Sequence, residues 1–129
     1  SPVLLDWFKK DRPFLGICVG MQVLFASSEE DPSVAGLGFF GGSVTTLNAP
    51  KRPMIGWAEV SWLETGFPDG AAYFVNSFVV KNHGEKMAET TYGETFCAAV
   101  RRGNVMAFQF HPEKSGAWGK EVLNRCLVC

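Results

Sequence analysis

"RPFLGICVGMQ", residues 12–22, decides the fold, because it joins an apolar strand to a helix through a turn that carries a cysteine. Residues 14–17 have the apolar character of a buried strand, and Cys18 then stands between Gly16 and Gly20. Glycines at these positions let the backbone turn tightly and approach its neighbours. The thiol is therefore expected to project where the strand ends and the helix begins, as in a nucleophile elbow.

This position has a chemical consequence for the thiol. A helix amino terminus favours anions, and cysteines placed there can have pKa values lowered from ~8.5 into the range of ~3.5 to 7.5. We expect a lowered pKa for Cys18 and a thiolate at neutral pH. The alternative is that Cys18 is a small core residue in a glycine-rich turn, and the motif alone leaves both interpretations open.

Outward from this stretch, the hydrophobic pattern alternates between helix and strand periods. It predicts helices over 2–10, 20–30 and 115–126, a loop over 31–42, and strands over 14–17, 43–47, 59–63, 72–80, 96–100 and 105–110. Ser115 is expected to lead the last helix. With no internal repeat and no linker, residues 1–129 are predicted to form one α/β domain.

Composition excludes several classes of function. The chain has 129 residues, 47% of them hydrophobic, which is enough for a core. Twelve Lys and Arg residues against thirteen Asp and Glu residues give a net charge of -1, and the basic residues are scattered, so nucleic-acid binding is not expected. Apolar runs are too short for a membrane span, and the first residues lack the features of a signal peptide, which predicts a cytoplasmic protein.

The cysteines at 18, 97, 126 and 129 are expected to be reduced, because a chain with this much apolar content does not need disulfides. Cys97 lies in a strand-like run and is predicted to be an inert buried residue. "CLVC" at 126–129 has the two-residue gap of metal sites, but no second pair or nearby histidine completes a zinc site. We therefore predict neither a metal nor another cofactor.

A cysteine nucleophile needs a base, and "QFHPEKS" at 109–115 offers one. His111 follows an apolar strand, and Glu113 comes two residues later, with Pro112 between them fixing the chain direction. Imidazole and carboxylate can therefore form a hydrogen bond on the same side of the chain. The alternative is a surface loop in which His111 only packs. His83 lies in a polar turn and is set aside as a structural residue.

Several motifs together resemble class I glutamine amidotransferases, most closely the glutaminase subunits of imidazole glycerol phosphate synthases. These are "GICVGMQVLFASSEE", "GLGFFGGSV", "KRPMIGWAEV", "YFVNSFVV" and "GNVMAFQFHPEKSG", in the order and spacing of the family. The resemblance implies a flavodoxin-like three-layer α/β fold and hydrolysis of glutamine through a cysteine thioester. It also implies a cyclase or synthase barrel subunit as the partner that uses the ammonia in histidine biosynthesis.

The resemblance assigns roles residue by residue. It implies Cys18 as nucleophile, His111 as acid and base, Glu113 as orienting carboxylate, and the Val19 amide as an oxyanion donor. It places Gln22, Asn76, Ser77 and Phe78 at the substrate, and Trp57 and Lys114 near the partner interface and the ammonia path. Gln22 could instead be a polar helix cap, and Trp57 could instead be a core residue.

The chain also departs from the family pattern. Met54 and Asn76 stand where the family usually has histidine. The family's first strands and helices, and a Pro-Gly-Val-Gly loop that supplies a second oxyanion amide, have no counterpart in the sequence. The chain is thus expected to be the C-terminal two thirds of an incomplete family domain, with an exposed sheet edge that favours self-association and negligible activity alone. A catalytically silent scaffold is the alternative.

Overall fold

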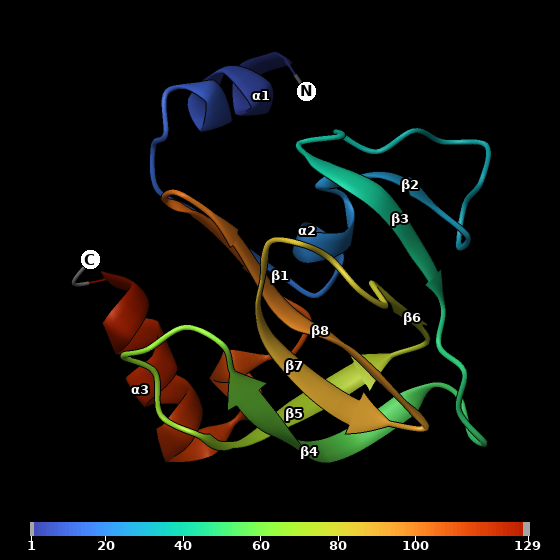
Figure 1. Ribbon diagram of the computed structural model, residues 1–129, viewed down its shortest axis with the longest axis vertical. Helices are drawn as coiled ribbons and strands as arrows, with labels where there is room; N and C mark the ends of the chain where they lie inside the picture. Colours follow the sequence, from blue (N-terminus) through green and yellow to red (C-terminus); the bar gives the residue numbers. More distant parts are fainter. Residues whose placement is uncertain (1, 128–129) are drawn as a thin grey trace.

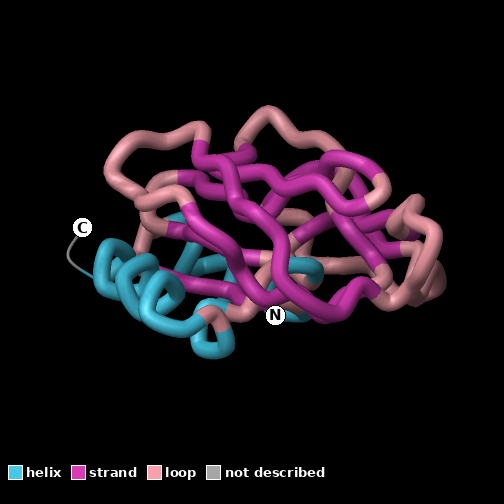
Figure 2. Tube along the Cα trace, turned by 90° about the horizontal axis from the view of Figure 1, so that it is seen from below, coloured by secondary structure: helices cyan, strands magenta, loops and turns pink. Residues whose placement is uncertain are grey.

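A computed structural model describes residues 2–127 of the chain as a mixed α/β structure (Figure 1). The elements in chain order are α1 (Pro2–Lys9), β1 (Phe14–Ile17), α2 (Val19–Gln22), β2 (Phe25–Ser28), β3 (Phe40–Thr46), β4 (Met54–Trp62), β5 (Gly70–Asn76), β6 (Phe78–Val79), β7 (Lys86–Tyr92), β8 (Glu94–Arg102), β9 (Val105–Phe108), the 3-10 turn η1 (Pro112–Lys114) and α3 (Gly116–Leu127). Strands dominate, and the helices gather along one side (Figure 2).

Two sheets organise the strands. The larger has six strands in the order β1-β9-β8-β7-β4-β5, and the smaller has three in the order β2-β3-β6. Within the larger sheet β1 and β9 are parallel, whereas the other neighbours are antiparallel. Among the described strands, β1 pairs with β9 alone and so lies at the edge of the sheet.

Strand β9 separates two hydrophobic clusters, because successive side chains point to opposite faces of a sheet. Met106 and Phe108 belong to the cluster that includes Val122 of α3. Val105 and Ala107 belong to the other cluster, which includes Phe8 of α1. In Figure 1, α3 lies on one side of β7 and β8, and the β2–β3 pair lies on the other. Both faces of the sheet are thus covered.

The predicted helix over 20–30 is wrong beyond Gln22. Helix α2 has four residues, and Phe25–Ser28 form strand β2, which pairs in parallel with β3. Phe25 lies opposite Phe40 in this pairing; both side chains are fully buried, with ring centroids 5.4 Å apart. Spacings of three and four residues fitted a helix, but pairing and burial of aromatic residues against β3 favour a strand.

Smaller differences concern other strands. Strand β7 is absent from the sequence-based prediction, although its threonines and tyrosine favour a sheet. The strand predicted over 72–80 is interrupted at Ser77, so that β5 belongs to the larger sheet and β6 to the smaller. The predicted loop over 31–42 ends earlier, because β3 already begins at Phe40. Strand β9 ends at Phe108, two residues before the predicted end.

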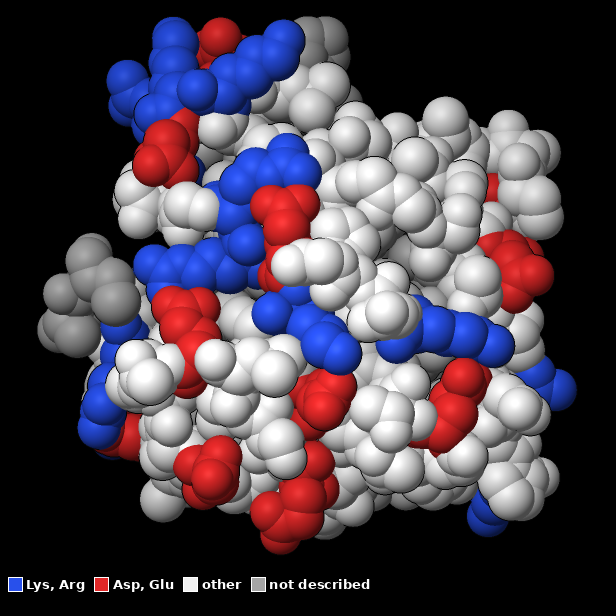
Figure 3. All heavy atoms as spheres, in the orientation of Figure 1, with Lys and Arg blue, Asp and Glu red and all other residues white. Residues whose placement is uncertain are grey.

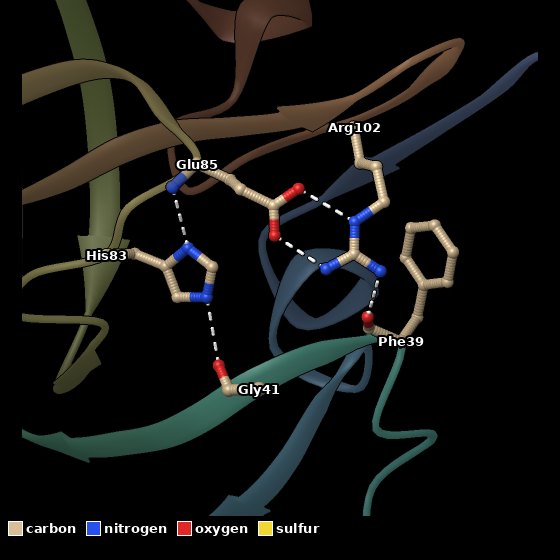
Figure 4. Close-up of polar contacts among 5 residues, drawn as sticks. All are labelled: Phe39, Gly41, His83, Glu85 and Arg102. Carbon is tan, nitrogen blue, oxygen red and sulfur yellow. Dashed lines mark hydrogen bonds and ion pairs between the residues drawn. The ribbon is translucent and has the colours of Figure 1, made fainter.

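A polar clamp joins the beginning of β3 to the region before β7 (Figure 4). Arg102 donates to both carboxylate oxygens of Glu85, at 2.7 and 2.6 Å, and to the carbonyl of Phe39 at 2.7 Å. His83 accepts from the Glu85 backbone N–H through Nδ1 at 3.0 Å, so its Nε2 donates to the Gly41 carbonyl at 2.9 Å. His83 therefore has a structural role, as the sequence suggested.

The surface shows no single-sign stripe on the face seen in Figure 3, where basic and acidic side chains are interspersed. Several of them form ion pairs, for example Lys10 with Asp6 and Lys81 with Glu94. No helix within residues 2–127 is long and apolar enough to cross a membrane.

The glycines on either side of Cys18 differ in the space available for a side chain, and a matched pair of variants tests this difference. A Cβ at Gly16 would lie 2.5 Å from the backbone oxygen of Gly20, whereas a Cβ at Gly20 would meet nothing within 4 Å. We predict that Gly16→Ala lowers the free energy of unfolding by about 1 to 3 kcal/mol. Gly20→Ala should leave it unchanged or raise it by up to ~1 kcal/mol. Urea unfolding measures both, and equal losses would contradict the close approach of β1 to α2.

Candidate active site

The turn that carries Cys18 has the strained backbone of a nucleophile elbow. Cys18 follows β1 directly and adopts φ 56° and ψ -109°, a conformation that residues with a side chain rarely take. Its N–H donates to the Phe108 carbonyl at 2.7 Å, and its carbonyl accepts from the N–H groups of Met21 and Gln22. These bonds hold the turn between β9 and α2, so that the position of Cys18 is fixed from both sides.

The half-buried thiol has two hydrogen-bond partners, one on β5 and one just after β9. Its sulphur lies 3.8 Å from the Val75 carbonyl oxygen, which can accept the S–H, and 3.7 Å from the side-chain nitrogen of Gln109. Gln109 is fully buried and accepts a hydrogen bond of 3.1 Å from Gln22. Gln22 also donates to the Phe78 carbonyl at 3.1 Å. The predicted substrate residue Gln22 is thus part of a buried amide network.

The expected lowering of the Cys18 pKa is wrong. Burial raises the pKa of the thiol above its ordinary value, and a hydrogen bond from the Val19 backbone N–H opposes this only in part. The carboxylates of Glu113 and Glu30 raise it further, whereas Lys114 lowers it. Helix α2 has only four residues, too few for a large dipole. At neutral pH Cys18 is therefore a thiol, and it needs a base to become a nucleophile.

His111 and Glu113 form the pair that the sequence predicted. His111 Nδ1 lies 2.9 Å from Glu113 Oε2. Burial alone would raise the pKa of Glu113, but the hydrogen bond to His111, a backbone hydrogen bond and the charge of Lys114 hold it below its ordinary value. An ionised carboxylate only accepts hydrogen bonds, so Nδ1 carries the proton and Nε2 is the basic nitrogen.

The backbone around this pair is held by a serine. His111 N–H donates to the Tyr73 carbonyl at 2.9 Å, and the Ser115 hydroxyl donates to the His111 carbonyl at 2.6 Å. The same hydroxyl accepts from the Tyr73 N–H at 2.9 Å. Ser115 precedes α3, as expected, but its side chain joins the His111 turn to β5 instead of capping the helix.

Cys18 and His111 lie beyond the same ends of two neighbouring strands. Strands β1 and β9 are parallel and Ile17 pairs with Phe108, so both chains leave the sheet at one edge. Glu113 is close enough to influence the pKa of Cys18. Among the hydrogen bonds of residues 2–127, however, none joins the Cys18 sulphur to the His111 ring. The two side chains thus lie beyond the same end of the sheet without a hydrogen bond between them in the described part of the chain.

A cavity of about 210 Å³ opens beside the thiol. Its lining includes Cys18, Val19, Gln22, Glu30, Pro53, Val75, Asn76, Ser77 and Phe78. All four predicted substrate residues are therefore at the cavity. Asn76 is nearly fully buried, and its side-chain oxygen has no hydrogen-bond partner within the described part of the chain. This volume is below the ~300 to 1,000 Å³ of pockets for drug-sized ligands, which fits a smaller metabolite.

Trp57 and Lys114 lie outside this cavity, on the surface near His111. Trp57 is 58% exposed, so the alternative that it is a core residue is wrong. Its ring meets the Tyr73 ring edge-on at 5.8 Å, and the Tyr73 carbonyl binds the His111 backbone. Ile55, on the same side of β4, is 64% exposed. Lys114 is exposed and follows Glu113 in η1.

Sequence reasoning missed two residues of the site. Glu30 lines the cavity, but the predicted helix over 20–30 hid the turn that brings it there. Gln109 contacts the thiol, and the signal for it was available: it is a polar residue within the apolar run that precedes His111. Within residues 2–127, no group of three or more His, Cys, Asp or Glu side chains is arranged to hold a metal ion.

Cysteine-dependent acyl transfer needs a thiol on a sharp turn, a base oriented by a carboxylate, and backbone donors beside the sulphur. The ends of β1 and β9 bring a thiol on such a turn, one backbone donor and a hydrogen-bonded histidine–carboxylate pair to the same end of an α/β scaffold, which makes this a candidate site of that kind. The sequence matches the family model for "Glutamine amidotransferase class-I" over residues 1–129. The chain therefore belongs to the class I glutamine amidotransferases.

Individual relatives agree with this assignment. The chain is 41% identical to "Imidazole glycerol phosphate synthase subunit HisH" of Thermotoga maritima, over 98% of this chain and 65% of that protein. It is 42% identical to "Imidazole glycerol phosphate synthase hisHF, chloroplastic" of Arabidopsis thaliana, over 98% of this chain and 24% of that protein. A crystal structure of a glutamine amidotransferase superposes with a TM-score of 0.70 at 20% identity, covering 94% of this chain and 65% of that one. The chain thus spans just under two thirds of the Thermotoga relative and of the solved structure.

The thiols should differ in reactivity, which alkylation with iodoacetamide can measure. Burial raises the pKa of Cys97 to about 11 and the side chain is inaccessible, so Cys97 should react very slowly. Cys18 should react faster than Cys97, and its rate should rise as the pH increases above neutral, because its pKa is raised. Peptide mapping assigns each site.

Cys18→Ser is the control for this experiment, since it should remove the pH-dependent label without changing that of Cys97. Full-rate alkylation of Cys18 below neutral pH would contradict the raised pKa. Cys126 lies in α3, and Cys129 lies outside the described residues. Both are counted separately by mapping.

Proposed function

We propose that this chain carries the catalytic thiol of a HisH-like glutaminase in histidine biosynthesis, which hydrolyses glutamine to glutamate and ammonia through a thioester on Cys18. The observation that carries the proposal is that the parallel strands β1 and β9 end side by side, at the same end of the sheet. There a strained Cys18, the hydrogen-bonded pair of His111 and Glu113, and a small cavity lie together. The family membership and the HisH relatives support the same activity.

The reaction follows from the protonation states. His111 Nε2 takes the proton of the Cys18 thiol, and the sulphur attacks the side-chain amide carbon of glutamine. The Val19 N–H donates to the oxyanion that forms. The carbon–nitrogen bond then breaks, and His111 returns its proton to the leaving nitrogen, so ammonia and a thioester result. Water, deprotonated by His111, attacks the thioester, and glutamate and the free thiol are released.

Substrate recognition uses the cavity beside the thiol. The carboxylate of Glu30 supplies a negative charge for the α-ammonium group of glutamine. The backbone from Asn76 to Phe78 and the side chain of Gln22 line the same cavity and offer polar groups for the remaining hydrogen bonds. Because Cys18 also lines it, an amino acid held by Glu30 would direct its side-chain amide at the sulphur.

The ammonia would pass to the synthase barrel subunit that the family resemblance implies, and the relatives' names, which refer to an imidazole glycerol phosphate synthase, support a synthase partner. The exposed face around His111 favours a protein partner there, because the large apolar side chains of Ile55 and Trp57 are exposed to water and their burial would be favourable. Lys114 adds a positive charge at the rim of this face. The reaction sequence and the cytoplasmic location remain predictions.

We also propose that residues 1–129 are the C-terminal two thirds of a flavodoxin-like family domain and need a further segment for full activity. The chain spans 65% of the Thermotoga relative. The Val19 amide is one oxyanion donor, and in the family a glycine-rich loop provides a second. Lack of one donor costs about 10² to 10³ in turnover, or about 2.7 to 4 kcal/mol in the transition state. Alone, the chain would have negligible glutaminase activity.

The alternative is that the chain acts as a silent scaffold that associates with itself. Strand β1 lies at the edge of the six-stranded sheet in the described region. A hollow of about 510 Å³ lies between α2, β2 and the loop that follows β2, and Val19, Val23 and Val34 are exposed there. An open strand edge and an apolar hollow on one chain both favour association, and a second copy of the chain is the simplest partner.

A complementation assay tests the catalytic proposal. Glutamate production from glutamine should be negligible for residues 1–129 alone, and should rise at least ~10²-fold when a family N-terminal segment is fused or added in trans. In the completed enzyme, Cys18→Ser and His111→Asn should each abolish turnover, because triad residues act as a unit. Retained turnover in either variant would remove that residue from the mechanism.

Light scattering at micromolar concentration tests self-association. The chain alone should form a dimer or a larger oligomer, because the β1 edge and the apolar hollow would otherwise face water. Addition of the N-terminal segment should compete for this surface and reduce the mass per particle to that of the complex. A strictly monomeric chain that does not aggregate would contradict the proposal.

A further inference from the structure

Gln109 is a buried amide that contacts the nucleophile, and the mechanism above gives it no role. Its side chain is fully buried, and its Nε2 lies 3.7 Å from the Cys18 sulphur. On either side of it in the chain, the rings of Phe108 and Phe110 stack at 4.8 Å in the apolar core. A buried amide is costly unless it is hydrogen-bonded, so its contacts are expected to be specific.

The orientation of the Gln109 amide is fixed by a chain of hydrogen bonds. The Phe78 carbonyl can only accept, so Gln22 must present its NH₂ group there. The same NH₂ group reaches Gln109 Oε1 at 3.1 Å. Gln109 therefore presents its oxygen to Gln22 and its NH₂ group to Cys18. The direction of every donor in the network follows from one backbone carbonyl.

The backbone of Gln109 is equally constrained. Its N–H donates to the Ala98 carbonyl at 2.8 Å, which joins the residue to β8 just beyond the end of β9. Gln22 belongs to α2, which begins one residue after Cys18. The amide network thus connects the segment that carries Cys18 to the segment that leads into His111, through a buried hydrogen bond between Gln22 and Gln109.

Before proton transfer, the sulphur has different partners from those it needs afterwards. In the thiol form, the S–H can donate to the Val75 carbonyl, 3.8 Å away. In the thiolate form this hydrogen bond is lost, because the Cys18 sulphur and the Val75 carbonyl oxygen are then both acceptors. The groups positioned to donate to a thiolate are the Val19 N–H and the Gln109 NH₂. A hydrogen bond to a charged group is stronger than one to a neutral group.

We propose that Gln109 is a positioning residue that donates a hydrogen bond to the Cys18 thiolate and holds the sulphur in place when its proton is removed, with its own direction set by Gln22 and the Phe78 carbonyl. Gln109 touches the sulphur through its amide and takes no proton itself. For its part in turnover, the inference rests on the proposed function. Its effect on the thiol requires only the full chain, without glutamine or a partner.

The test is the pH dependence of iodoacetamide alkylation at Cys18 in the full chain, followed by peptide mapping. Gln109→Met keeps a similar volume but removes the donor, so it should shift the pH profile upward and reduce the alkylation rate about tenfold on its rising limb. Gln109→Glu should shift it further, because its carboxylate repels the thiolate. Gln109→Asn keeps the amide but withdraws it by one methylene, and its shift should resemble that of Gln109→Met.

Thr90→Val is the matched control, because it removes one hydrogen bond of a buried side chain, that from Thr90 Oγ1 to the Glu59 carbonyl, with no contact to Cys18. It should leave the Cys18 profile unchanged, and slow labelling of Cys97 in every variant reports that the fold is intact. If Gln109→Met does not fold by this measure, Gln109→Asn decides. An unchanged Cys18 profile in a folded Gln109 variant would overturn the proposal, even if glutaminase activity were established. A shifted profile would uphold it, even if no glutaminase activity were found.

Discussion

The parallel pairing of β1 with β9 is the constraint on which the site depends. Two parallel strands end at the same edge of a sheet, so the residues that follow them become neighbours however far apart they are in the sequence. Here Ile17 lies opposite Phe108, and the Cys18 N–H donates to the Phe108 carbonyl as the last bond of this ladder. A shift of one residue in this register would exchange the faces of β1 and separate the thiol from the segment that carries His111.

Local sequence predicted the parts of the site that local geometry determines. The glycines around Cys18 indicated the sharp turn, and the spacing of His111 and Glu113 indicated their hydrogen bond. The length of α2 could not be found in this way. Residues after Gln22 have spacings that suit a helix, and only the burial of Phe25 against the distant Phe40 makes the strand more favourable. Strand β7 was missed for a related reason, since its stability comes from pairing with both β8 and β4.

The error in the Cys18 pKa has the same origin. The elbow and the helix are local features, but the largest influence on the pKa is burial, and the sulphur's contacts with Val75 and Gln109 come from segments far away in the chain. The carboxylates of Glu30 and Glu113 act in the same direction, and the position of Glu30 became clear only with the correct end of α2. Motifs therefore identify which atoms take part, whereas protonation depends on the packing of the whole domain.

The backbone of Cys18 has a consequence for selection. A residue with a side chain whose backbone adopts φ 56° and ψ -109° carries a strain of roughly 1 to 3 kcal/mol. A glycine at the same position would largely avoid this strain. The fold would thus be more stable with glycine than with cysteine at this turn. If a lineage no longer needed a thiol at this turn, a change from cysteine to glycine at position 18 would not reduce the stability of the fold. Stability alone would favour glycine at position 18. A cysteine kept there would therefore indicate selection for its chemistry and not for stability.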